Sequence, residues 1–546
     1  MSSLFEAHRA LIDTAVSAAR DRGFWSAFSE VPKTYDETAA ADGKAAFEAL
    51  LGQKFDLGQS GAAIGGEVSP FGPALGVTYS QREPAELIAA AERATGAWAA
   101  ASVEDRCGIA VEILVRLNRA SFLIAHAVEH TTGQAFAMAF QAGGPHAQDR
   151  GLEAVAYAYQ EMARIPGHVL WEKPAGRSSI RLDKQFHIVP RGIGLVIGCA
   201  TFPTWNTYPA LFADLVTGNA VIVKPHPAAI LPLAITVRIA REVLAEQGFD
   251  PNIVQLAPDT VAAPIAKELA TDPAIGMVDF TGSSAFGGWL RHNLRDKLVF
   301  TEEAGVNTIV IDSTDAFKPM CQNIAFSLSL YSGQMCTSPQ SILVPKSGIE
   351  TDEGHKSFDE VAAGIAAAID ALLSEPARAA GVLGAIQNPA TLERIADARS
   401  LGRIVRDSAA LESAARTATP LILAVEASDE AAFMEERFGP ISFVVATSDT
   451  AASIALATRA ARLKGAITAA LYTTDTALIE AAGVAYAKAG VALSVNLTGG
   501  IFVNQSAAFS DYHVSGANPA GNACLTDAAF VASRFRVVCV RRPAAA

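Results

Sequence analysis

The sequence predicts an α/β protein with two parallel sheets, and three observations support this prediction. From about residue 190 onward, short runs of β-branched and aliphatic residues alternate with longer segments of helical periodicity. The short runs are apolar almost throughout, which is typical of parallel strands covered by helices on both faces. The 546 residues are 50% hydrophobic and 18% charged, so the chain is long enough for several structural units and too apolar to be disordered.

The first part of the chain reads as helical after a mixed beginning. Residues 1–80 combine an amphipathic stretch with a glycine-rich region, and we interpret them as an ordered N-terminal extension. Pro84 then begins a helix, because Pro is favoured at the first helical position and apolar residues follow at helical spacing. We expect a second helix whose apolar residues are Ile113, Leu117, Ala120 and Ile124. Two more helical segments reach Met162.

Residues 171–189 change to an alternation of polar and apolar residues, which predicts an extended hairpin with Gly176 in its turn. Near the end of the chain, the run FRVVCVRR within 526–546 predicts another strand. An arm of this kind, lying between helical and α/β parts, often serves the association of subunits.

Two series of βα units follow. The first has predicted strands at 193–197, 220–223, 253–256 and 277–280, with a helix around 233–244 that ends at Gly248. The second has predicted strands at 308–311, 341–344, 441–445 and 468–472, separated by Ala-rich helices such as 359–373. We therefore expect two α/β domains.

Composition excludes several classes of function. A formal net charge of −13 argues against a nucleic-acid or anionic-membrane partner, since such proteins usually carry a basic excess or patch. The six cysteines form no CxxC pair, so we expect no zinc ribbon, no disulfide framework and a reducing compartment. Glu6, His8 and Arg9 interrupt the N-terminus where a signal peptide would be apolar, and no run of about 18 apolar residues exists. We expect a cytoplasmic protein that holds no metal.

Six short motifs place polar or reactive side chains at predicted strand ends and turns. They are TFPTWNTYP (201–209), VIVKPHP (221–227), DFTGSSAFG (279–287), TEEAGVN (301–307), YSGQMCTS (331–338) and EERFGP (435–440). Each alone has an ordinary structural explanation: Cys336 as a small buried hydrophobe, Asn206 as a loop cap, Lys224 as a surface lysine. The glycine spacing in DFTGSSAFG matches neither a P-loop nor the GxGxxG fingerprint.

Together, and in this order, the motifs resemble the aldehyde dehydrogenase superfamily over roughly residues 80–530. The separation of 34 residues between Glu302 and Cys336 aligns with the family pattern without a gap, which favours Glu302 over Glu303 as the matching acid. The glycine-rich N-terminus and other details look like the branch associated with bacterial phenylacetate degradation.

The resemblance implies an aldehyde-dehydrogenase-like fold. A Rossmann-type cofactor domain would comprise 81–170 and 190–304, after the extension 1–80. An α/β catalytic domain would span 305–525, and the β-arm 171–189 with the tail 526–546 would serve oligomerisation. The arm and tail would pair between subunits in a homodimer or a dimer of dimers.

The resemblance also implies a reaction. Cys336 would attack an aldehyde to give a thiohemiacetal and then a thioester, and Glu302 would activate the water that releases the acid. The side-chain amide of Asn206 and the backbone N–H of Cys336 would stabilise the alkoxide, and one such donor is typically worth about 10²–10³ in turnover. The cofactor-binding residues would be Lys224 at the adenosine ribose, Gly282, Ser283 and Gly287 at the pyrophosphate, Glu436 and Phe438 at the nicotinamide, and Thr204 and Trp205 in the nearby loop.

Three departures from the family pattern bear on the ligands. Many NAD-preferring members carry a Glu where this chain has Pro227, and Lys224 and His226 could attract a 2′-phosphate, so we expect NADP, with NAD possible. The segment EEAGVN (302–307) resembles the corresponding segment in branches of the family that act on CoA-linked semialdehydes. The segment AFSDYHVSG (508–516) replaces the usual PFGG, which predicts an unusual substrate entrance.

We therefore expect NAD(P)-dependent oxidation of an aldehyde to a carboxylate, with a CoA-linked semialdehyde from phenylacetate ring cleavage as the substrate. Two alternatives stay open. A CoA-acylating enzyme would release a thioester, although such relatives usually lack the acid that Glu302 provides. A non-catalytic nucleotide-binding protein on the same fold is the other.

Overall fold

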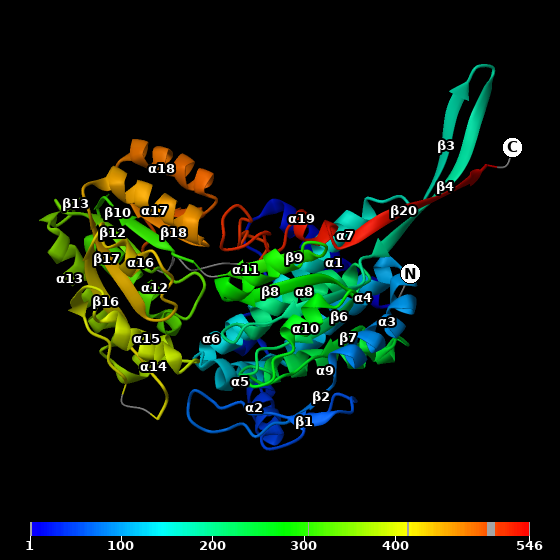
Figure 1. Cartoon of the computed structure of the whole chain (residues 1–546), viewed down its shortest axis with the longest axis horizontal. Coiled ribbons are helices and arrows are strands. Elements are labelled where there is room, and N and C mark those ends of the chain that lie inside the picture. The colour runs from blue at the N-terminus through cyan, green and yellow to red at the C-terminus, as the bar shows by residue number, and fades with distance from the viewer. Residues whose placement is uncertain (1–2, 304, 412–413, 500–507, 545–546) are drawn as a thin grey trace.

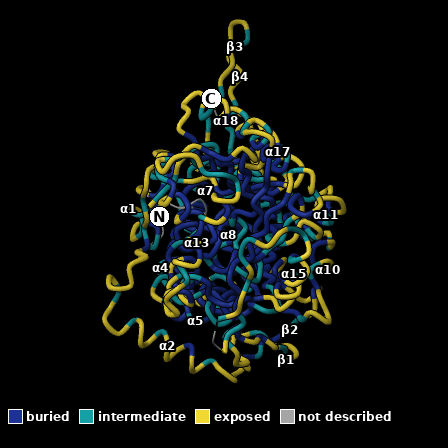
Figure 2. Tube along the Cα trace, turned by 90° about the vertical axis from the view of Figure 1, so that its left-hand side faces the viewer, coloured by how far each residue is buried: buried dark blue, intermediate teal, exposed yellow. Residues whose placement is uncertain are grey.

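The computed structural model describes residues 3–303, 305–411, 414–499 and 508–544. Two lobes, each built around one parallel sheet, lie side by side, and an arm projects from one of them (Figure 1). The buried residues gather in the interior of the lobes, whereas the arm is exposed along most of its length (Figure 2). The predicted α/β class is confirmed.

The first sheet has five parallel strands in the order β7-β6-β5-β8-β9. The strands are β5 (Ile193–Ile197), β6 (Ala220–Lys224), β7 (Val254–Leu256), β8 (Ile275–Gly282) and β9 (Leu298–Glu303). The first four were predicted and are confirmed, and β9 was missed. Strand order reverses beside β5, and ligands bind at such points, beyond the carboxyl ends of the strands.

Helices connect these strands and cover them. They are α8 (Pro203–Val216), α9 (Leu231–Glu246), α10 (Ala266–Thr271) and α11 (Ser284–Asn293), with the 3-10 turn Pro251–Ile253 before β7. The helices that precede the arm are α3 (Pro84–Ala100), α4 (Val103–Arg119), α5 (Ser121–Thr132), α6 (Phe136–Gln141) and α7 (Ala147–Ala163), with a π-helical turn at Ala142–His146. The single helix predicted through Ala120 is wrong, because Ala120 leaves helical geometry (φ −91°, ψ 9°) and the chain continues as a separate helix.

The second sheet has seven strands in the order β15-β16-β17-β12-β10-β18-β19, with only β15 antiparallel to its neighbour. The strands are β10 (Thr308–Ile311), β12 (Ser341–Pro345), β15 (Arg403–Arg406), β16 (Leu421–Glu426), β17 (Ile441–Thr447), β18 (Thr468–Tyr472) and β19 (Ala492–Val495). Ile309 and Val310, neighbours on β10, belong to different apolar clusters, so both faces of the sheet are packed.

The helices of this lobe are α12 (Phe317–Ser329), α13 (Phe358–Leu373), α14 (Pro376–Leu383), α15 (Ala390–Ala398), α16 (Glu430–Phe433), α17 (Thr450–Lys464) and α18 (Thr476–Ala489). A 3-10 turn at Leu330–Gly333 follows α12. A small sheet is formed by β11 (Ser313–Thr314), β13 (Ile349–Thr351) and β14 (Gly354–Lys356).

The arm is an antiparallel sheet of β3 (His168–Ala175), β4 (Ser178–Pro190) and β20 (Phe535–Pro543), and β20 follows the short helix α19 (Ala528–Ala532). The hairpin and the tail strand were both predicted. However, β20 pairs with β4 of the same chain, from Phe535 opposite Pro190 to Pro543 opposite Leu182. Pairing of the tail strand therefore occurs within one chain, and pairing of the arm between subunits stays a prediction.

The N-terminal extension is part of the packed structure. The helix α1 (Ser3–Asp21) buries Phe5 and Ile12 in the core that includes α4 and α7. Next come the 3-10 turn Pro32–Thr34, α2 (Ala39–Leu50), β1 (Ala62–Ile64) and β2 (Tyr79–Gln81). Among the described helices, none combines the length and apolar content needed to cross a membrane.

Candidate active site

Cys336 lies on a loop of unusual backbone conformation that follows the 3-10 turn after α12. Tyr331 and Ser332 both have positive φ (52° and 50°), a conformation that non-glycine residues rarely adopt. Hydrogen bonds hold it: the Tyr331 hydroxyl donates to Thr132 O (2.5 Å), and the Ser332 hydroxyl is 3.1 Å from a carbonyl of α14. On the other side, Asn307 Nδ2 donates to Cys336 O (2.8 Å). The cysteine is thus presented by a loop whose shape is fixed from several sides.

Three reactive side chains from distant parts of the chain meet at this cysteine. Cys336 Sγ lies 3.6 Å from Glu302 Oε1 and 3.8 Å from His513 Nε2. His513 Nε2 lies 2.9 Å from Glu302 Oε1, and both of these side chains are buried. Glu302 comes from the end of β9 and His513 from the C-terminal segment after residue 507. One ligand atom from each of the three lies within 4.8 Å of the others, which is close enough to hold a divalent cation.

The surroundings of this cluster favour the ionised form of Glu302 and the protonated form of Cys336. Burial by itself would raise the pKa of Glu302, but the charge and hydrogen bond of His513, with smaller contributions from Cys336 and Arg150, hold it below its usual value. Burial raises the pKa of the Cys336 thiol well above its usual value, and the charge of Glu302 raises it further. The resting site therefore holds an ionised Glu302 and a protonated Cys336.

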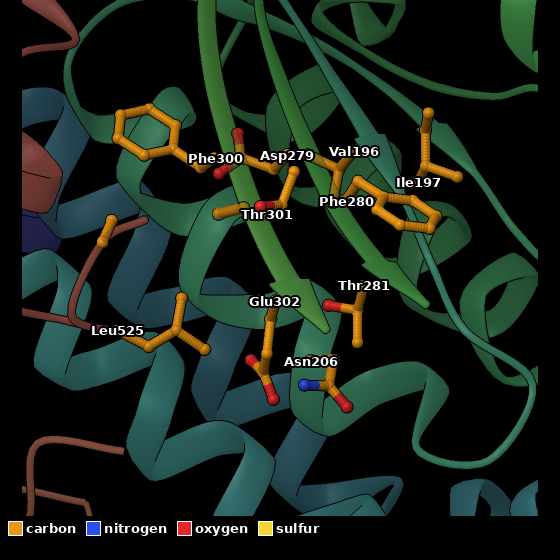
Figure 3. Close-up of a pocket in the computed structure, with 12 residues that line it drawn as sticks. Val196, Ile197, Asn206, Asp279, Phe280, Thr281, Phe300, Thr301, Glu302 and Leu525 are labelled. Carbon is orange, nitrogen blue, oxygen red and sulfur yellow. The ribbon is translucent and has the colours of Figure 1, made fainter. Parts of the chain in front are cut away.

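Asn206 brings a hydrogen-bond donor to the part of the site that contains Cys336. It lies on the first turns of α8, and its Oδ1 accepts from the Cys199 thiol (3.5 Å). Its Nδ2 is buried and has no hydrogen-bond partner among the residues that the structure describes. Figure 3 shows Asn206 and Glu302 side by side beyond the strand ends, with their polar atoms pointing away from the sheet. A buried donor without a partner is costly, so it indicates a ligand atom that completes the site.

Two cavities meet at Cys336 and Asn206. The first, of about 870 Å³, lies between the lobes and is lined by residues of both. It contains five of the predicted cofactor residues, namely Lys224, Gly282, Ser283, Glu436 and Phe438. The second, of about 410 Å³, is mostly apolar, with Met138, Phe202, Trp205, Phe326 and Leu330 in its lining. Both cavities include Asn206 and Cys336, and both open to solvent.

Three predicted cofactor residues lie elsewhere. Thr204 is buried and donates to Gly143 O (2.8 Å), and Trp205 lines the second cavity. Successive helical residues point about 100° apart, so Thr204, Trp205 and Asn206 cannot face one cavity together. Gly287 lies in α11 against Glu303, whose Oε1 would be 2.1 Å from an added Cβ. The lack of a side chain at Gly287 therefore makes room for Glu303, which pairs with Arg291.

The first cavity offers features that fit a dinucleotide. Gly282 ends β8, and Ser283 is the N-cap of α11, so a helix N-terminus opens into the cavity beside unsubstituted backbone. Such an N-terminus favours an anion such as a pyrophosphate. At another part of the cavity, burial raises the pKa of Glu436 to about 7, an effect that Arg394 opposes and Glu303 reinforces.

The turn that carries Glu436 is held by Gln340 at the start of β12. Gln340 Nε2 donates to the carbonyls of Phe433 (3.0 Å) and Glu435 (2.9 Å), and Oε1 accepts from Arg437 N (2.6 Å). No motif predicted this support, because a single Gln before a strand has no recognisable pattern.

Charge at Lys224 is offset by a residue that the sequence analysis missed. Lys224 Nζ lies 2.7 Å from Oδ1 of the buried Asp259. Burial, together with the charge of Lys224, lowers the pKa of His226 to about 4, so this imidazole is neutral near pH 7. The expectation of NADP rested on Pro227 in place of a Glu and on free positive charge at Lys224 and His226, and the second of these reasons no longer holds. Asp259 follows β7 at the same sheet edge, which is the signal that could have found it.

His513 is the other functional candidate that sequence reasoning missed. The departure AFSDYHVSG drew attention to this segment, but nothing in the pattern placed its histidine beside Cys336. Part of the 495–515 loop, residues 500–507, lies outside the described residues.

A nucleotide-type sheet crevice joined to a half-buried cysteine at the meeting of two cavities defines a dinucleotide-dependent oxidoreductase. The model of the aldehyde dehydrogenase family matches residues 77–521, and the chain belongs to this family. It is an NAD(P)-dependent aldehyde dehydrogenase.

The chain is similar to several known proteins. A solved structure described as an NAD-dependent aldehyde dehydrogenase from Burkholderia multivorans is 54% identical, covers 100% of both chains and has a TM-score of 0.98. The N-succinylglutamate 5-semialdehyde dehydrogenase of Burkholderia multivorans is 27% identical over 391 residues, which are 70% of this chain and 75% of that protein. A 1-pyrroline-5-carboxylate dehydrogenase from Thermus is 18% identical, with a TM-score of 0.74 over 95% of this chain and 99% of that one, and shows the fold alone. These names give no support to the narrower phenylacetate branch.

Proposed function

We propose that this enzyme oxidises an aldehyde to a carboxylate through a covalent intermediate on Cys336. The observation that carries the proposal is that Cys336 and Asn206 are shared by the two cavities. An aldehyde in the second cavity and a dinucleotide in the first would both lie against the same sulfur. When bound, the dinucleotide supplies the hydride acceptor, and Lys224, Ser283, Glu436 and Phe438 would hold it along the first cavity.

Cys336, Glu302 and Asn206 each have a different role in the proposed reaction. Cys336 adds to the aldehyde carbon after its proton passes to Glu302, the nearest ionised acceptor (3.6 Å). Asn206 Nδ2 then donates to the oxygen, which carries the negative charge after addition. Loss of hydride from the same carbon leaves a thioester. After Glu302 has released the thiol proton to solvent, its carboxylate takes a proton from water, the hydroxide adds to the thioester, and the thiolate leaves as the acid is released. Because the pKa of Cys336 is raised, acylation becomes faster as the pH rises.

The presence of Glu302 within reach of Cys336 favours water over CoA as the second acceptor. A CoA-acylating reaction would give an acyl-CoA product and a rate that depends on added CoA. We expect neither, and we expect a free carboxylate in their place.

The lining of the second cavity supports an aldehyde with a mainly apolar chain. Apart from Cys336 and His513, its ionisable side chains among the described residues are Glu30 and His146, which pair with each other (2.6 Å). A CoA-linked semialdehyde of phenylacetate ring cleavage fits if its chain enters the cavity and its CoA remains in solvent. Free aldehydes of the same chain length provide the comparison.

For the cofactor, we propose NAD rather than NADP, because Asp259 offsets Lys224 and places a negative charge near the expected 2′ position. The similar Burkholderia multivorans structure is described as NAD-dependent. Asp259→Asn should raise kcat/KM for NADP relative to NAD by about fivefold, since one neutralised charge is worth roughly 1 kcal/mol at contact distance in water. An unchanged ratio would contradict this assignment.

The decisive experiment is a cofactor-reduction screen that pairs NAD and NADP with free and CoA-linked aldehydes. We expect Cys336→Ala to abolish turnover and to retain cofactor binding by fluorescence titration. Cys199→Ala, the neighbouring cysteine that contacts Asn206, is the matched control and should keep measurable turnover. Turnover retained in Cys336→Ala would end the thiolate mechanism. Stabilisation by cofactor with no turnover on any aldehyde would favour the non-catalytic alternative.

We further propose association through the arm as a homodimer or a dimer of dimers. Apolar side chains are exposed on it, namely Leu170, Ile180, Val189, Val537, Val538 and Val540. Exposed apolar patches commonly mark association surfaces. Sedimentation should show an oligomer at micromolar concentration, and Val538→Lys should weaken it. A monomeric wild-type protein would contradict the proposal.

A further inference from the structure

We propose that His513 is a positioning residue that orients Glu302 as the water-activating base and commits its Oε2 oxygen to the water. The inference rests on the proposed function. It starts from the buried contact between His513 Nε2 and Glu302 Oε1 at 2.9 Å.

The direction of this hydrogen bond follows from the charge of Glu302. An ionised carboxylate can only accept, so His513 must carry its proton on Nε2 for the contact to be favourable. This holds for the neutral ring and for the imidazolium. The same nitrogen cannot then accept the proton of Cys336, although Sγ lies 3.8 Å away. His513 therefore does not form a cysteine–histidine dyad and acts through Glu302.

The two oxygens of Glu302 are consequently distinct. Oε1 faces both His513 Nε2 and the Cys336 thiol. Oε2 is buried and has no hydrogen-bond partner among the described residues. With Oε1 occupied by the imidazole, Oε2 is the oxygen that remains for a water molecule approaching a thioester on Cys336.

The imidazole is itself held in place. Its ring packs edge-on against Trp205, with ring centroids 4.6 Å apart and an interplanar angle of 75°. The guanidinium of Arg150 in turn lies over the Trp205 ring, 5.1 Å from its centroid. Earlier in the same segment, Phe509 is buried against Trp25 of the N-terminal extension (4.7 Å). The extension and α8 thus fix the segment that carries His513.

Removal of the imidazole should change how Glu302 titrates. The groups that act on its charge are His513 from the C-terminal segment, Cys336 from its loop and Arg150 from α7. His513 makes the largest favourable contribution, so its loss raises the pKa of Glu302. The acidic limb of the pH profile for kcat should then move to higher pH, while hydride transfer, which does not use the water, is less affected.

The test compares His513→Ala, His513→Gln and Ser510→Ala with the wild type under rapid mixing with aldehyde and cofactor. In His513→Ala we expect a burst of about one reduced cofactor per site, followed by turnover slowed roughly 10- to 100-fold, as for other orienting partners. His513→Gln retains an amide N–H donor and should recover part of the rate. Ser510→Ala alters an exposed position of the same segment, where the hydroxyl donates to Gly23 O, and serves as the control.

Unfolding temperature and cofactor affinity, measured for each variant, separate misfolding from a catalytic effect. Equal losses in burst and slow phase, or an acidic limb that does not move in His513→Ala, would overturn the role of His513. Absence of cofactor reduction by the wild-type enzyme with every aldehyde would instead overturn the proposed function and this inference with it.

Discussion

Glu436 illustrates at the residue scale how burial can make ligand binding depend on pH. Its carboxyl lines the first cavity, and burial raises its pKa to about 7, so it is protonated in the free enzyme below that pH. Hydrogen bonds to an ionised acceptor are stronger than those to a neutral one. A ribose hydroxyl should therefore bind better to the ionised form.

We predict that the Kd for the dinucleotide rises several-fold as the pH falls from 8 to 6. Glu436→Gln should weaken binding at pH 8 and remove most of this dependence, because the amide does not titrate. Isothermal titration calorimetry across this pH range measures both effects. An identical pH dependence in wild type and variant would contradict the role of Glu436.

The residues of the site differ in how far the sequence could predict them. Glu302 and Glu303 are neighbours on β9, and successive strand residues point to opposite faces, so only Glu302 reaches Cys336 while Glu303 meets Arg291. The separation of 34 residues between Glu302 and Cys336 also favoured Glu302 over Glu303 in the sequence analysis. His513 could not be placed, because its contact depends on a segment that no local pattern positions. Asp259 was overlooked, although it follows a predicted strand at the sheet edge that holds Lys224.

At the scale of elements, eight strands of the two sheets were predicted, because strands buried on both faces leave continuous apolar runs in the sequence. The prediction missed β9, β15, β16 and β19. The division between α4 and α5 was missed, since apolar spacing continues across Ala120 while the backbone does not. The hydrogen bonds that hold the Cys336 loop could not be predicted either, because they join side chains to backbone carbonyls of segments distant in the sequence.

Two adjacent glycines of α11 provide a test of packing within an element. An added Cβ at Gly287 would meet Glu303, whereas one at Gly288 would meet nothing within 4 Å. We predict that Gly287→Ala destabilises the protein by about 1 to 3 kcal/mol, typical of overpacking. Gly288→Ala should be neutral or stabilise by up to about 1 kcal/mol, since Ala favours helix. Thermal unfolding compares the two, and equal effects would contradict the packing role of Gly287.

On the scale of the whole molecule, Arg534 joins the C-terminal segment to the first lobe. Its guanidinium is fully buried and contacts Asp214 of α8 (2.6 Å) and Asp279 of β8 (2.6 and 2.8 Å). Removing one partner of a buried ion pair leaves uncompensated charge and typically costs about 3 to 5 kcal/mol.

Arg534→Met should therefore lower the free energy of unfolding by about that amount, whereas Arg536→Met, two residues later on exposed backbone, should change it little. Burial raises the pKa of Asp214 even with Arg534 present. A carboxyl with a raised pKa in the folded state loses stability as the pH rises, so the defect of Arg534→Met should grow from pH 5 to pH 8. Unfolding midpoints at both pH values test this, and a defect that shrinks with pH would contradict it.

The stretch from residue 508 to 543 runs without interruption from His513, through Arg534, to the last strand of the arm. One consequence concerns how the protein is handled. Truncation or fusion at the carboxyl terminus changes β20, and the segment before this strand carries His513, which contacts Glu302. Specific activity can therefore serve as a sensitive reporter of an intact arm, long before any loss of the bulk fold becomes visible.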